Sequence, residues 1–319
     1  MPRRLFSAIW PTGFLVTKID PMQILVTGAS GQVGLALAKE LSPLATLRLT
    51  NRQDLDLSKP HSIPERLEDI KPDLIINAAA YTAVDKAESE PDTADAVNGT
   101  AVGVLGEWAA RNDVPLIHFS TDYVFDGQAT EPYDESHPVN PLSVYGKSKT
   151  KGERLLLRSG APCLIVRTAW VYSATGKNFL KTIVRLAAER DELAVVSDQI
   201  GTPTSAGQIA KFIHFLVSEG REALPARFEK SSHIVHVTAS NWTSWHGFAS
   251  AIVAGIKRHG IAAKASAVRA IPTSDYPTPA VRPKFSRLST ARLALVFGFH
   301  LEPWEQALDG VLEELLSKQ

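Results

Sequence analysis

From Met22 onward, short apolar runs alternate with longer amphipathic stretches along the chain. Apolar runs rich in β-branched residues are typical of strands buried on both faces, whereas apolar positions three or four residues apart are typical of helices. The pattern predicts strands at residues 23–27, 46–49, 74–77, 115–120 and 164–167, and helices at 34–41, 62–70, 93–111 and 141–158. This alternation indicates an α/β fold with a Rossmann-like, doubly wound parallel sheet.

After Val171 the alternation is less regular, and it predicts a smaller second part. Four prolines between residues 271 and 287 predict an extended loop there. Helices are expected at 179–188, 208–218, 245–258 and after Pro303, with a strand at 234–237. We expect a sheet domain over residues 22–172, to which 205–237 return, and a smaller, partly discontinuous C-terminal domain over 173–204 and 238–319.

The first 21 residues form a separate case. An arginine pair followed by an apolar stretch is typical of a signal peptide, but Pro11 and Gly13 interrupt the stretch and no small-residue cleavage site follows it. We expect an extension outside the fold and a cytoplasmic protein. The one cysteine, Cys163, excludes an internal disulfide framework, and no apolar run approaches the roughly 18 residues that span a membrane.

Composition places the chain among ordinary globular proteins, because 44 % of its 319 residues are hydrophobic and 21 % are charged. Lys and Arg together number 34, as do Asp and Glu. A balanced charge predicts no general attraction to nucleic acid or to an anionic membrane.

A glycine-rich turn follows the first predicted strand. Gly28, Gly31 and Gly34 have the spacing G-x-x-G-x-x-G and open the first predicted helix. Glycines let the backbone approach a pyrophosphate, and the free N–H groups of the helix start attract its charge. The turn therefore predicts dinucleotide binding.

Residues after the second strand bear on the choice of dinucleotide. Arg52 lies where an acidic residue would accept the ribose hydroxyls of NAD, and an arginine there pairs with the 2′-phosphate of NADP. This favours NADPH. NADH stays an alternative, because Arg52 also fits a solvated loop position and Asp54 or Asp56 could bind the adenosine ribose.

A Tyr–Lys pair supplies candidate proton chemistry. Tyr145 and Lys149 lie four residues apart, on one face of a predicted helix. A nearby ammonium stabilises a phenolate and lowers the pKa of the phenol, which would suit Tyr145 to protonate a developing alkoxide. Thr121, at the end of the fourth strand, could donate a hydrogen bond to the same oxygen.

Together these motifs resemble the extended short-chain dehydrogenase/reductase family, and within it the reductases of nucleotide-linked sugars. The resemblance runs from Met22 almost to the C-terminus. It is carried by residues 28–34, 77–88, 120–125, 145–149, 167–172, 198–204 and 275–283.

The resemblance implies that residues 22–172 form an NAD(P)-binding domain and that the smaller part binds substrate. The implied reaction is NADPH-dependent reduction of the C4 ketone of dTDP-4-dehydro-β-L-rhamnose, a step toward cell-surface polysaccharide. The implied catalytic residues are Thr121, Tyr145 and Lys149. Arg52 is added to the cofactor contacts from the argument on NADP above. The expected cofactor contacts are then Gly28, Gly31, Gln32, Val33, Arg52, Asp56, Leu57, Ala78, Ala79, Ala80, Tyr145 and Lys149. The implied substrate contacts are Thr121, Asp122, Tyr145, Trp170 and Asn178.

Some members of that family are described with Mg²⁺, but no carboxylate or histidine cluster with ligand spacing stands out. Glu88 and Glu90 are expected to be solvated loop charges. We therefore assign no metal site in the protein, although Mg²⁺ stays open as a cofactor, and a homodimer is one possible assembly.

Two alternatives stay open. One is another nucleotide-sugar ketoreductase, epimerase or dehydratase of the same superfamily. Dehydratases commonly carry an Asp-Glu pair beside the threonine, whereas Thr121 is followed by Asp122 and Tyr123, which favours a reductase. The other is a non-catalytic protein like the regulatory subunit of methionine adenosyltransferase, which the presence of both Tyr145 and Lys149 argues against.

Overall fold

The computed structural model of the chain describes residues 7–9, 15–17 and 22–317. Most of the predicted extension, residues 1–21, lies outside these ranges. Its described pieces, β1 (Ser7–Ile9) and β2 (Leu15–Thr17), pair with each other in antiparallel register. Within the described ranges, no helix is long and apolar enough to cross a membrane.

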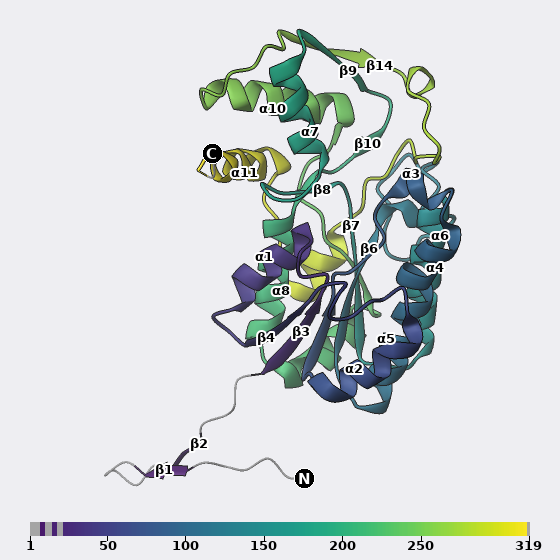
Figure 1. Cartoon of the computed structure of the whole chain (residues 1–319), viewed down its shortest axis with the longest axis vertical. Helices are drawn as coiled ribbons and strands as arrows, with labels where there is room; N and C mark the ends of the chain where they lie inside the picture. Colours follow the sequence, from purple (N-terminus) through teal and green to yellow (C-terminus); the bar gives the residue numbers. More distant parts are fainter. Residues whose placement is uncertain (1–6, 10–14, 18–21, 318–319) are drawn as a thin grey trace.

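Six parallel strands form the central sheet, as predicted (Figure 1). Their spatial order is β4-β3-β5-β6-β7-β12. The chain winds in one direction from β3 to β4 and in the other from β5 onward, so the reversal lies between β3 and β5. Ligands of such sheets bind at this point, beyond the carboxyl ends of the strands. The strands are β3 (Gln23–Thr27), β4 (Thr46–Thr50), β5 (Leu74–Asn77), β6 (Leu116–Thr121), β7 (Cys163–Thr168) and β12 (Ile234–His236).

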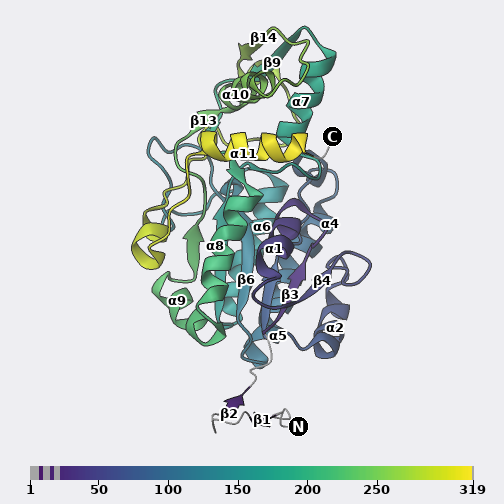
Figure 2. The same ribbon diagram turned by 90° about the vertical axis from the view of Figure 1, so that its left-hand side faces the viewer.

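Helices cover both faces of the sheet, which explains why its inner strands are apolar at nearly every position. In β3, Ile24 and Val26 pack toward α1 (Gln32–Leu41) and α8 (Ala206–Ser218), which lie side by side in Figure 2. Leu25 packs toward the opposite face. The helices on that face are α2 (Ile63–Ile70), α5 (Ala101–Arg111) and α6 (Val144–Arg158).

The predicted helix over residues 93–111 is interrupted. It begins as α4 (Pro91–Asp95), passes through a π-helical turn, η2 (Ala96–Thr100), and continues as α5. The remaining short helical segments of the sheet domain are η1 (Pro60–Ser62), α3 (Val84–Ala87), η3 (Asp122–Val124), η4 (Arg221–Ala223) and α9 (Leu224–Lys230).

The smaller second part has a core of its own, above the sheet in Figure 1. Helices α7 (Phe179–Glu189), α10 (Trp245–Arg258) and α11 (Trp304–Leu316) contribute to this core. Two strands missed by the sequence analysis, β9 (Glu192–Val196) and β14 (Ala267–Ile271), pair in parallel there.

Short elements connect the two parts. Strand β8 (Val171–Tyr172) pairs with β11 (Thr204–Ser205), and β10 (Ile200–Gly201) pairs with β13 (Thr243–Ser244). The last short segments are η5 (Thr273–Asp275) and the π-helical η6 (Leu293–Phe297).

The division of the chain into two domains stays a prediction. One stretch argues for a changed boundary, because Leu293, Phe297 and Leu301 pack in the core between the sheet and α8. We therefore propose to assign residues 293–301 to the sheet domain rather than to the second part.

Candidate active site

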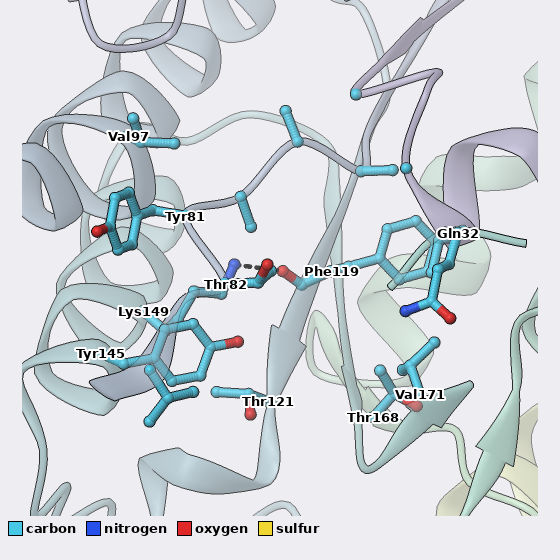
Figure 3. Close-up of a pocket in the computed structure, with 18 of the residues that line it drawn as sticks. Gln32, Tyr81, Thr82, Val97, Phe119, Thr121, Tyr145, Lys149, Thr168 and Val171 are labelled. Atoms are coloured by element: carbon cyan, nitrogen blue, oxygen red, sulfur yellow. Dashed lines mark hydrogen bonds between the residues drawn. The ribbon is translucent and has the colours of Figure 1, made fainter. Parts of the chain in front are cut away.

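A cleft of about 750 Å³ lies at the carboxyl ends of β3, β5, β6 and β7. It brings together all the residues expected to be catalytic or to contact cofactor or substrate, whereas Asp54, the alternative to Asp56, does not line it. Figure 3 shows Gln32 on one side of this cleft and Tyr145 with Lys149 on the other. The proposed residues that line it are Gly28, Gly31, Gln32, Val33, Arg52, Asp56, Leu57, Ala78, Ala79, Ala80, Thr121, Asp122, Tyr145, Lys149, Trp170 and Asn178.

The glycine turn forms a close backbone cradle at the start of α1. Gly28 has a φ of 64°, and a Cβ there would come within 2.7 Å of the Ala79 Cα. A Cβ on Gly34 would collide with the Gly28 carbonyl oxygen. Helix α1 has Gly31 as its N-cap and no side-chain cap, so first-turn N–H groups are left to bind an anion. The cradle fits the diphosphate of a dinucleotide.

Arg52 lies at the rim of the cleft, just beyond β4. Its side chain is 73 % exposed, and its Nε lies 3.5 Å from Asp56 Oδ1. The Ser58 hydroxyl donates to the same carboxylate at 2.7 Å, and this bond, followed by the backbone N–H of Ser58 and by Arg52, holds the pKa of Asp56 below its usual value although partial burial opposes it. Because its side chain is mostly exposed, the Arg52 guanidinium can also contact a phosphate group bound at this edge of the cleft.

Tyr145 lies in the first turn of α6. The Ser143 hydroxyl caps this helix by accepting from the Gly146 N–H at 3.1 Å, so α6 begins at Val144 rather than at Pro141 as predicted. The phenol is 9 % exposed, and its hydroxyl points from the helix into the cleft (Figure 3). Burial raises the pKa of Tyr145 to about 12, although the contact with Thr121 opposes the rise.

Lys149 lies one turn further along α6 and is 1 % exposed. Its Nζ donates to the Phe119 carbonyl oxygen at 2.6 Å and lies 3.2 Å from His118 Nε2. Burial lowers the pKa of Lys149 to about 8, and the charge of Glu153 opposes the decrease. These bonds differ from the expected pairing of the ammonium with the phenol, because β6 supplies acceptors that reach Nζ. We found no sequence signal for His118.

Thr121 and Asp122 complete the inner wall of the cleft. The Thr121 hydroxyl donates to Asp122 Oδ1 at 3.0 Å and accepts from the Tyr123 N–H at 3.2 Å. Asp122 is 1 % exposed, and burial raises its pKa to about 6. Because a hydroxyl has one proton, Thr121 donates either to Asp122 or to a ligand oxygen.

Glu88 is not the solvated loop charge that the sequence analysis expected, whereas Glu90 keeps a partly exposed side chain. Glu88 is half-buried and accepts from the Val144 N–H at 2.9 Å, which fixes the start of α6 next to Tyr145. Glu90 accepts from the Tyr81 hydroxyl and from Lys86 Nζ, each at 2.7 Å. The donor to Glu88 comes from a distant segment, whereas Lys86 is a local neighbour of Glu90, whose side chain stays 36 % exposed.

The opposite wall of the cleft is aromatic. Trp170 was expected to offer a flat face to substrate, and it stacks on Trp245 with ring centroids 3.5 Å apart and planes 6° apart. Gly201 makes room for the Trp170 ring, since a Cβ there would come within 2.5 Å of it. Trp245 also lines the cleft. The sequence analysis missed it, because Trp245 is far from Trp170 along the chain.

One polar contact joins two residues that line the cleft, and a second holds an arginine of the neighbouring cavity. Asn178 Nδ2 donates to Gln32 Oε1 at 2.7 Å, which links the cap of α7 to the glycine turn. Arg282 forms a bidentate pair with Asp85, at 2.7 and 3.0 Å. The Arg282 guanidinium lowers the pKa of Asp85 below its usual value.

A second cavity of about 680 Å³ adjoins the first. Tyr123, Phe179 and Trp245 line both cavities. The second cavity is lined by three cationic side chains as well as by apolar ones. These cations are Arg185, Arg190 and Arg282.

No group of three or more His, Cys, Asp or Glu side chains among the described residues is arranged to hold a metal ion.

A doubly wound sheet with a glycine turn at its reversal point and a buried Tyr–Lys pair in the same cleft define a nicotinamide-nucleotide-dependent oxidoreductase of the short-chain type. A family model described as the RmlD substrate binding domain matches residues 22–317. The chain belongs to this family.

Individual relatives agree with the family match. The dTDP-4-dehydrorhamnose reductase of Burkholderia thailandensis is 46 % identical over 300 residues, which cover 93 % of this chain and 100 % of the relative. The enzyme of that name from Escherichia coli K12 is 40 % identical over 93 % of this chain and 99 % of its own length. A crystal structure of dTDP-4-dehydrorhamnose reductase from Bacillus anthracis, in complex with NADP, has a TM-score of 0.83 and 32 % identity, and the match covers 92 % of this chain and 99 % of that one.

Proposed function

We propose that this chain reduces the C4 ketone of dTDP-4-dehydro-β-L-rhamnose to a hydroxyl with NADPH and so forms dTDP-L-rhamnose, a precursor of cell-surface polysaccharide. The observation that carries the proposal is the meeting of Thr121, Tyr145 and Lys149 with the glycine turn in one cleft. The two relatives described above, which match over 93 % of this chain, bear the name of this activity.

The cofactor would lie in the cleft along the ends of β3 and β5, whose following residues line it. The N–H groups of Gln32 and Val33 at the start of α1 would bind its diphosphate, where side chains at Gly28 or Gly34 would close the cradle. The Arg52 guanidinium favours NADPH, because it would pair with the extra phosphate on the adenosine ribose. When bound, the reduced nicotinamide would supply a hydride to the carbonyl carbon.

Tyr145 would supply the proton. Its high pKa, about 12, keeps the phenol protonated at neutral pH, and the alkoxide that forms at C4 is a stronger base than a phenolate. The proton therefore moves from Tyr145 Oη to the C4 oxygen, which becomes the hydroxyl of the product. Thr121 would donate a hydrogen bond to the same oxygen before the transfer. The Lys149 ammonium, on the same face of α6, would stabilise the phenolate that remains.

The pH dependence follows from Lys149. Its pKa, lowered to about 8 by burial, means that the ammonium is present at neutral pH and is lost as the pH rises. The rate of reduction should therefore be constant near neutral pH and should fall progressively above about pH 8.

The nucleotide half of the substrate would occupy the second cavity. Arg190 offers positive charge to a diphosphate, and Arg185 and Arg282 add charge that Glu189 and Asp85 partly neutralise. Aromatic side chains offer apolar faces to a base. The sugar would then reach past Tyr123 and Trp245, which line both cavities, toward Tyr145.

The direct test is turnover of purified dTDP-4-dehydrorhamnose, followed by loss of NADPH or NADH absorbance and by NMR of the sugar product. We expect formation of dTDP-L-rhamnose with a higher kcat/KM for NADPH than for NADH. Oxidation of neither cofactor in the presence of this substrate would contradict the proposed function.

Assembly and location are inferred from the sequence alone, and metal dependence from the sequence together with the side chains of the described residues. We expect full activity after treatment with EDTA and dialysis, because the described residues hold no ligand cluster. Activity that is lost and then restored by Mg²⁺ would contradict this. A homodimer and a cytoplasmic location stay predictions, which light scattering and cell fractionation would test.

A further inference from the structure

A polar contact crosses from the glycine turn to the second part of the chain. Asn178 Nδ2 donates to Gln32 Oε1 at 2.7 Å, and Asn178 is the N-cap residue of α7. Gln32 is the first residue of α1, directly after Gly31. The two residues are 146 positions apart, so the contact exists only in the folded chain. The roles proposed above use the backbone N–H of Gln32 but not its side chain.

Backbone groups around Asn178 fix the direction of this bond. The Lys181 N–H donates to Asn178 Oδ1 at 3.0 Å, and the Ser173 carbonyl oxygen accepts from Asn178 Nδ2 at 2.8 Å. A backbone N–H only donates and a carbonyl oxygen only accepts, so the amide of Asn178 has one self-consistent orientation. Its nitrogen faces Gln32, and Gln32 must therefore present its oxygen in return.

The amide of Gln32 is consequently held at its oxygen and available at its nitrogen. The oxygen is turned toward Asn178 and toward the Ser173 hydroxyl, which lies 3.0 Å away. The Nε2 points into the cleft (Figure 3), where it has no hydrogen-bond partner among the described residues. An amide nitrogen is a donor, and this one belongs to the same turn as the N–H groups that would bind the cofactor diphosphate. It would therefore donate to that diphosphate as well.

Helix α7 leads from Asn178 to the second cavity. Phe179 lines both cavities, and its ring packs on Trp245 with centroids 4.6 Å apart. Four further residues of this helix line the second cavity, and they are Thr182, Ile183, Arg185 and Leu186. A helix is a rigid element, so the position of its first turn affects the side chains that follow. The side chain that caps α7 therefore helps to position one wall of the second cavity.

We propose that Gln32 couples the binding of the cofactor to the binding of the sugar nucleotide. A diphosphate that accepts from Gln32 Nε2 favours the amide orientation in which Oε1 holds Asn178, and with it the position of α7. Because both ligands favour the same arrangement, each increases the affinity of the protein for the other by the same factor. The inference rests on the proposed function, since that function places a nucleotide in the second cavity.

Calorimetric titration with dTDP measures this coupling. Because dTDP carries no sugar, it would occupy the second cavity without touching the nicotinamide. We expect saturating NADP⁺ to lower the Kd for dTDP by about fivefold to tenfold, and saturating dTDP to lower the Kd for NADP⁺ by the same factor. A Kd for dTDP that is equal with and without NADP⁺ would overturn the proposal.

Two substitutions remove the contact from its two ends. Gln32→Ala removes the amide, whereas Asn178→Ser keeps an oxygen that caps α7 and removes only the nitrogen that donates to Gln32. In both variants NADP⁺ should change the Kd for dTDP by less than about twofold. Asn112→Ala is the matched control, because the Asn112 amide donates to the Trp108 carbonyl oxygen and lines neither cavity. It should keep the native coupling, and native coupling in Gln32→Ala would refute the role of Gln32.

Two fragments of the cofactor identify the group that Gln32 contacts. 2′-Phospho-ADP-ribose keeps the diphosphate and lacks the nicotinamide, so at saturation it should lower the Kd for dTDP by the same factor as NADP⁺. 2′-AMP lacks the diphosphate and should change that Kd by less than about twofold. The same factor for both fragments would show that the diphosphate is not the partner of Gln32, against the proposal.

Hydrogen exchange tests the coupling without a sugar nucleotide. The N–H groups of Lys181 and Thr182 bond to Asn178, so NADP⁺ alone should slow their exchange by about threefold or more in the unsubstituted protein and leave it unchanged in Gln32→Ala. Exchange that NADP⁺ does not slow in the unsubstituted protein would overturn the inference, even if the reductase activity is present. Slowed exchange in a protein that binds no dTDP would bear out the contact of Gln32 with Asn178 and contradict the proposed function instead.

Discussion

The two walls of the cleft are built in different ways. On the sheet side, the glycine turn and Thr121 lie at strand ends, and Tyr145 lies in the first turn of a helix. The position of each group in the site is therefore set by the strand or helix that carries it. On the other side, Trp170 stacks on Trp245, and Arg282 pairs with Asp85, a residue 197 positions away. The first wall is a set of local motifs, whereas the second exists only after the chain has folded.

The two walls also differ in their proposed roles: the sheet side carries out the reduction, and the other side binds the sugar nucleotide. On the sheet side, the two groups proposed for proton transfer are deeply buried, with Lys149 at 1 % and Tyr145 at 9 % exposure, which holds them in fixed positions. The other side is joined to it by polar contacts at the rim, such as Asn178 with Gln32. We therefore expect substitutions on the sheet side to act mainly on kcat or cofactor binding, and substitutions at the rim to act mainly on KM for the sugar nucleotide.

The largest effect is expected from Tyr145→Phe. The ring stays in place and only the proton donor is lost, so kcat should fall by about 10²- to 10⁴-fold while NADPH affinity stays within about twofold. Steady-state kinetics and fluorescence titration with NADPH measure the two quantities. Tyr123→Phe is the control, since that ring lies 5.6 Å from Tyr145 in a T-shaped contact. Similar losses of kcat in both variants would mean that Tyr145 is not the acid.

The next largest effect is expected from Gly28→Ala, which tests the cofactor cradle. A side chain there strains a φ of 64° and meets Ala79. We expect the Kd for NADPH to rise by about tenfold to a hundredfold, because positive-φ strain alone costs roughly 1–2 kcal/mol and the collision adds to it. Calorimetric titration measures the Kd.

Gly260→Ala is the matched control for strain without collision. Gly260 has a φ of 74° and open space where its Cβ would be. It should lower thermal stability and leave the Kd for NADPH unchanged. An unchanged Kd in Gly28→Ala would remove the glycine turn from the cofactor site.

A smaller effect is expected from Arg52→Glu at the rim of the sheet side. It should lower the ratio of kcat/KM for NADPH to that for NADH by about tenfold, because a charge-assisted bond to the extra phosphate is lost and the site is largely exposed to solvent. The two cofactors are compared at fixed ionic strength. A ratio that stays constant would show that Arg52 does not contact the cofactor.

The smallest effect is expected from Asp85→Asn, which weakens the contact of Arg282 with the sheet domain. The pair is partly exposed, with side-chain exposures of 22 % for Arg282 and 42 % for Asp85, so screening limits its strength. KM for the sugar nucleotide should rise by about threefold with little change in kcat. Asp309→Asn breaks a surface pair with Arg258 and is the control. A fall in kcat alone would contradict the division of roles between the walls.

Sequence patterns predicted the central sheet closely, because its strands are short apolar runs that helices cover on both faces. Strand β5 matches its predicted range and β6 differs by one residue at each end. The same patterns missed β9 and β14. Strand β9 is exposed at its first and third positions, so it is not a continuous buried run, and its partner β14 lies some seventy residues further along the chain. A pair of that kind is stabilised by non-local contacts, which no local pattern records.

The candidate site divides along the same line. The sequence identified Tyr145, Lys149 and the glycine turn, and the structure brings them into one cleft. It did not indicate Trp245 or His118, and it misjudged Glu88, because each acts on a residue from a distant segment. Residue type and spacing predict which groups are available for chemistry, whereas the partners that orient them depend on tertiary packing.

The most direct test is the distance from Tyr145 Oη to the C4 oxygen in a crystal structure of the protein with NADP⁺ and dTDP-L-rhamnose. The account predicts a hydrogen bond of about 2.6–3.2 Å, with the Thr121 hydroxyl on the same oxygen. A sugar whose C4 oxygen lies beyond the reach of Tyr145, with a different side chain beside it, would contradict the account.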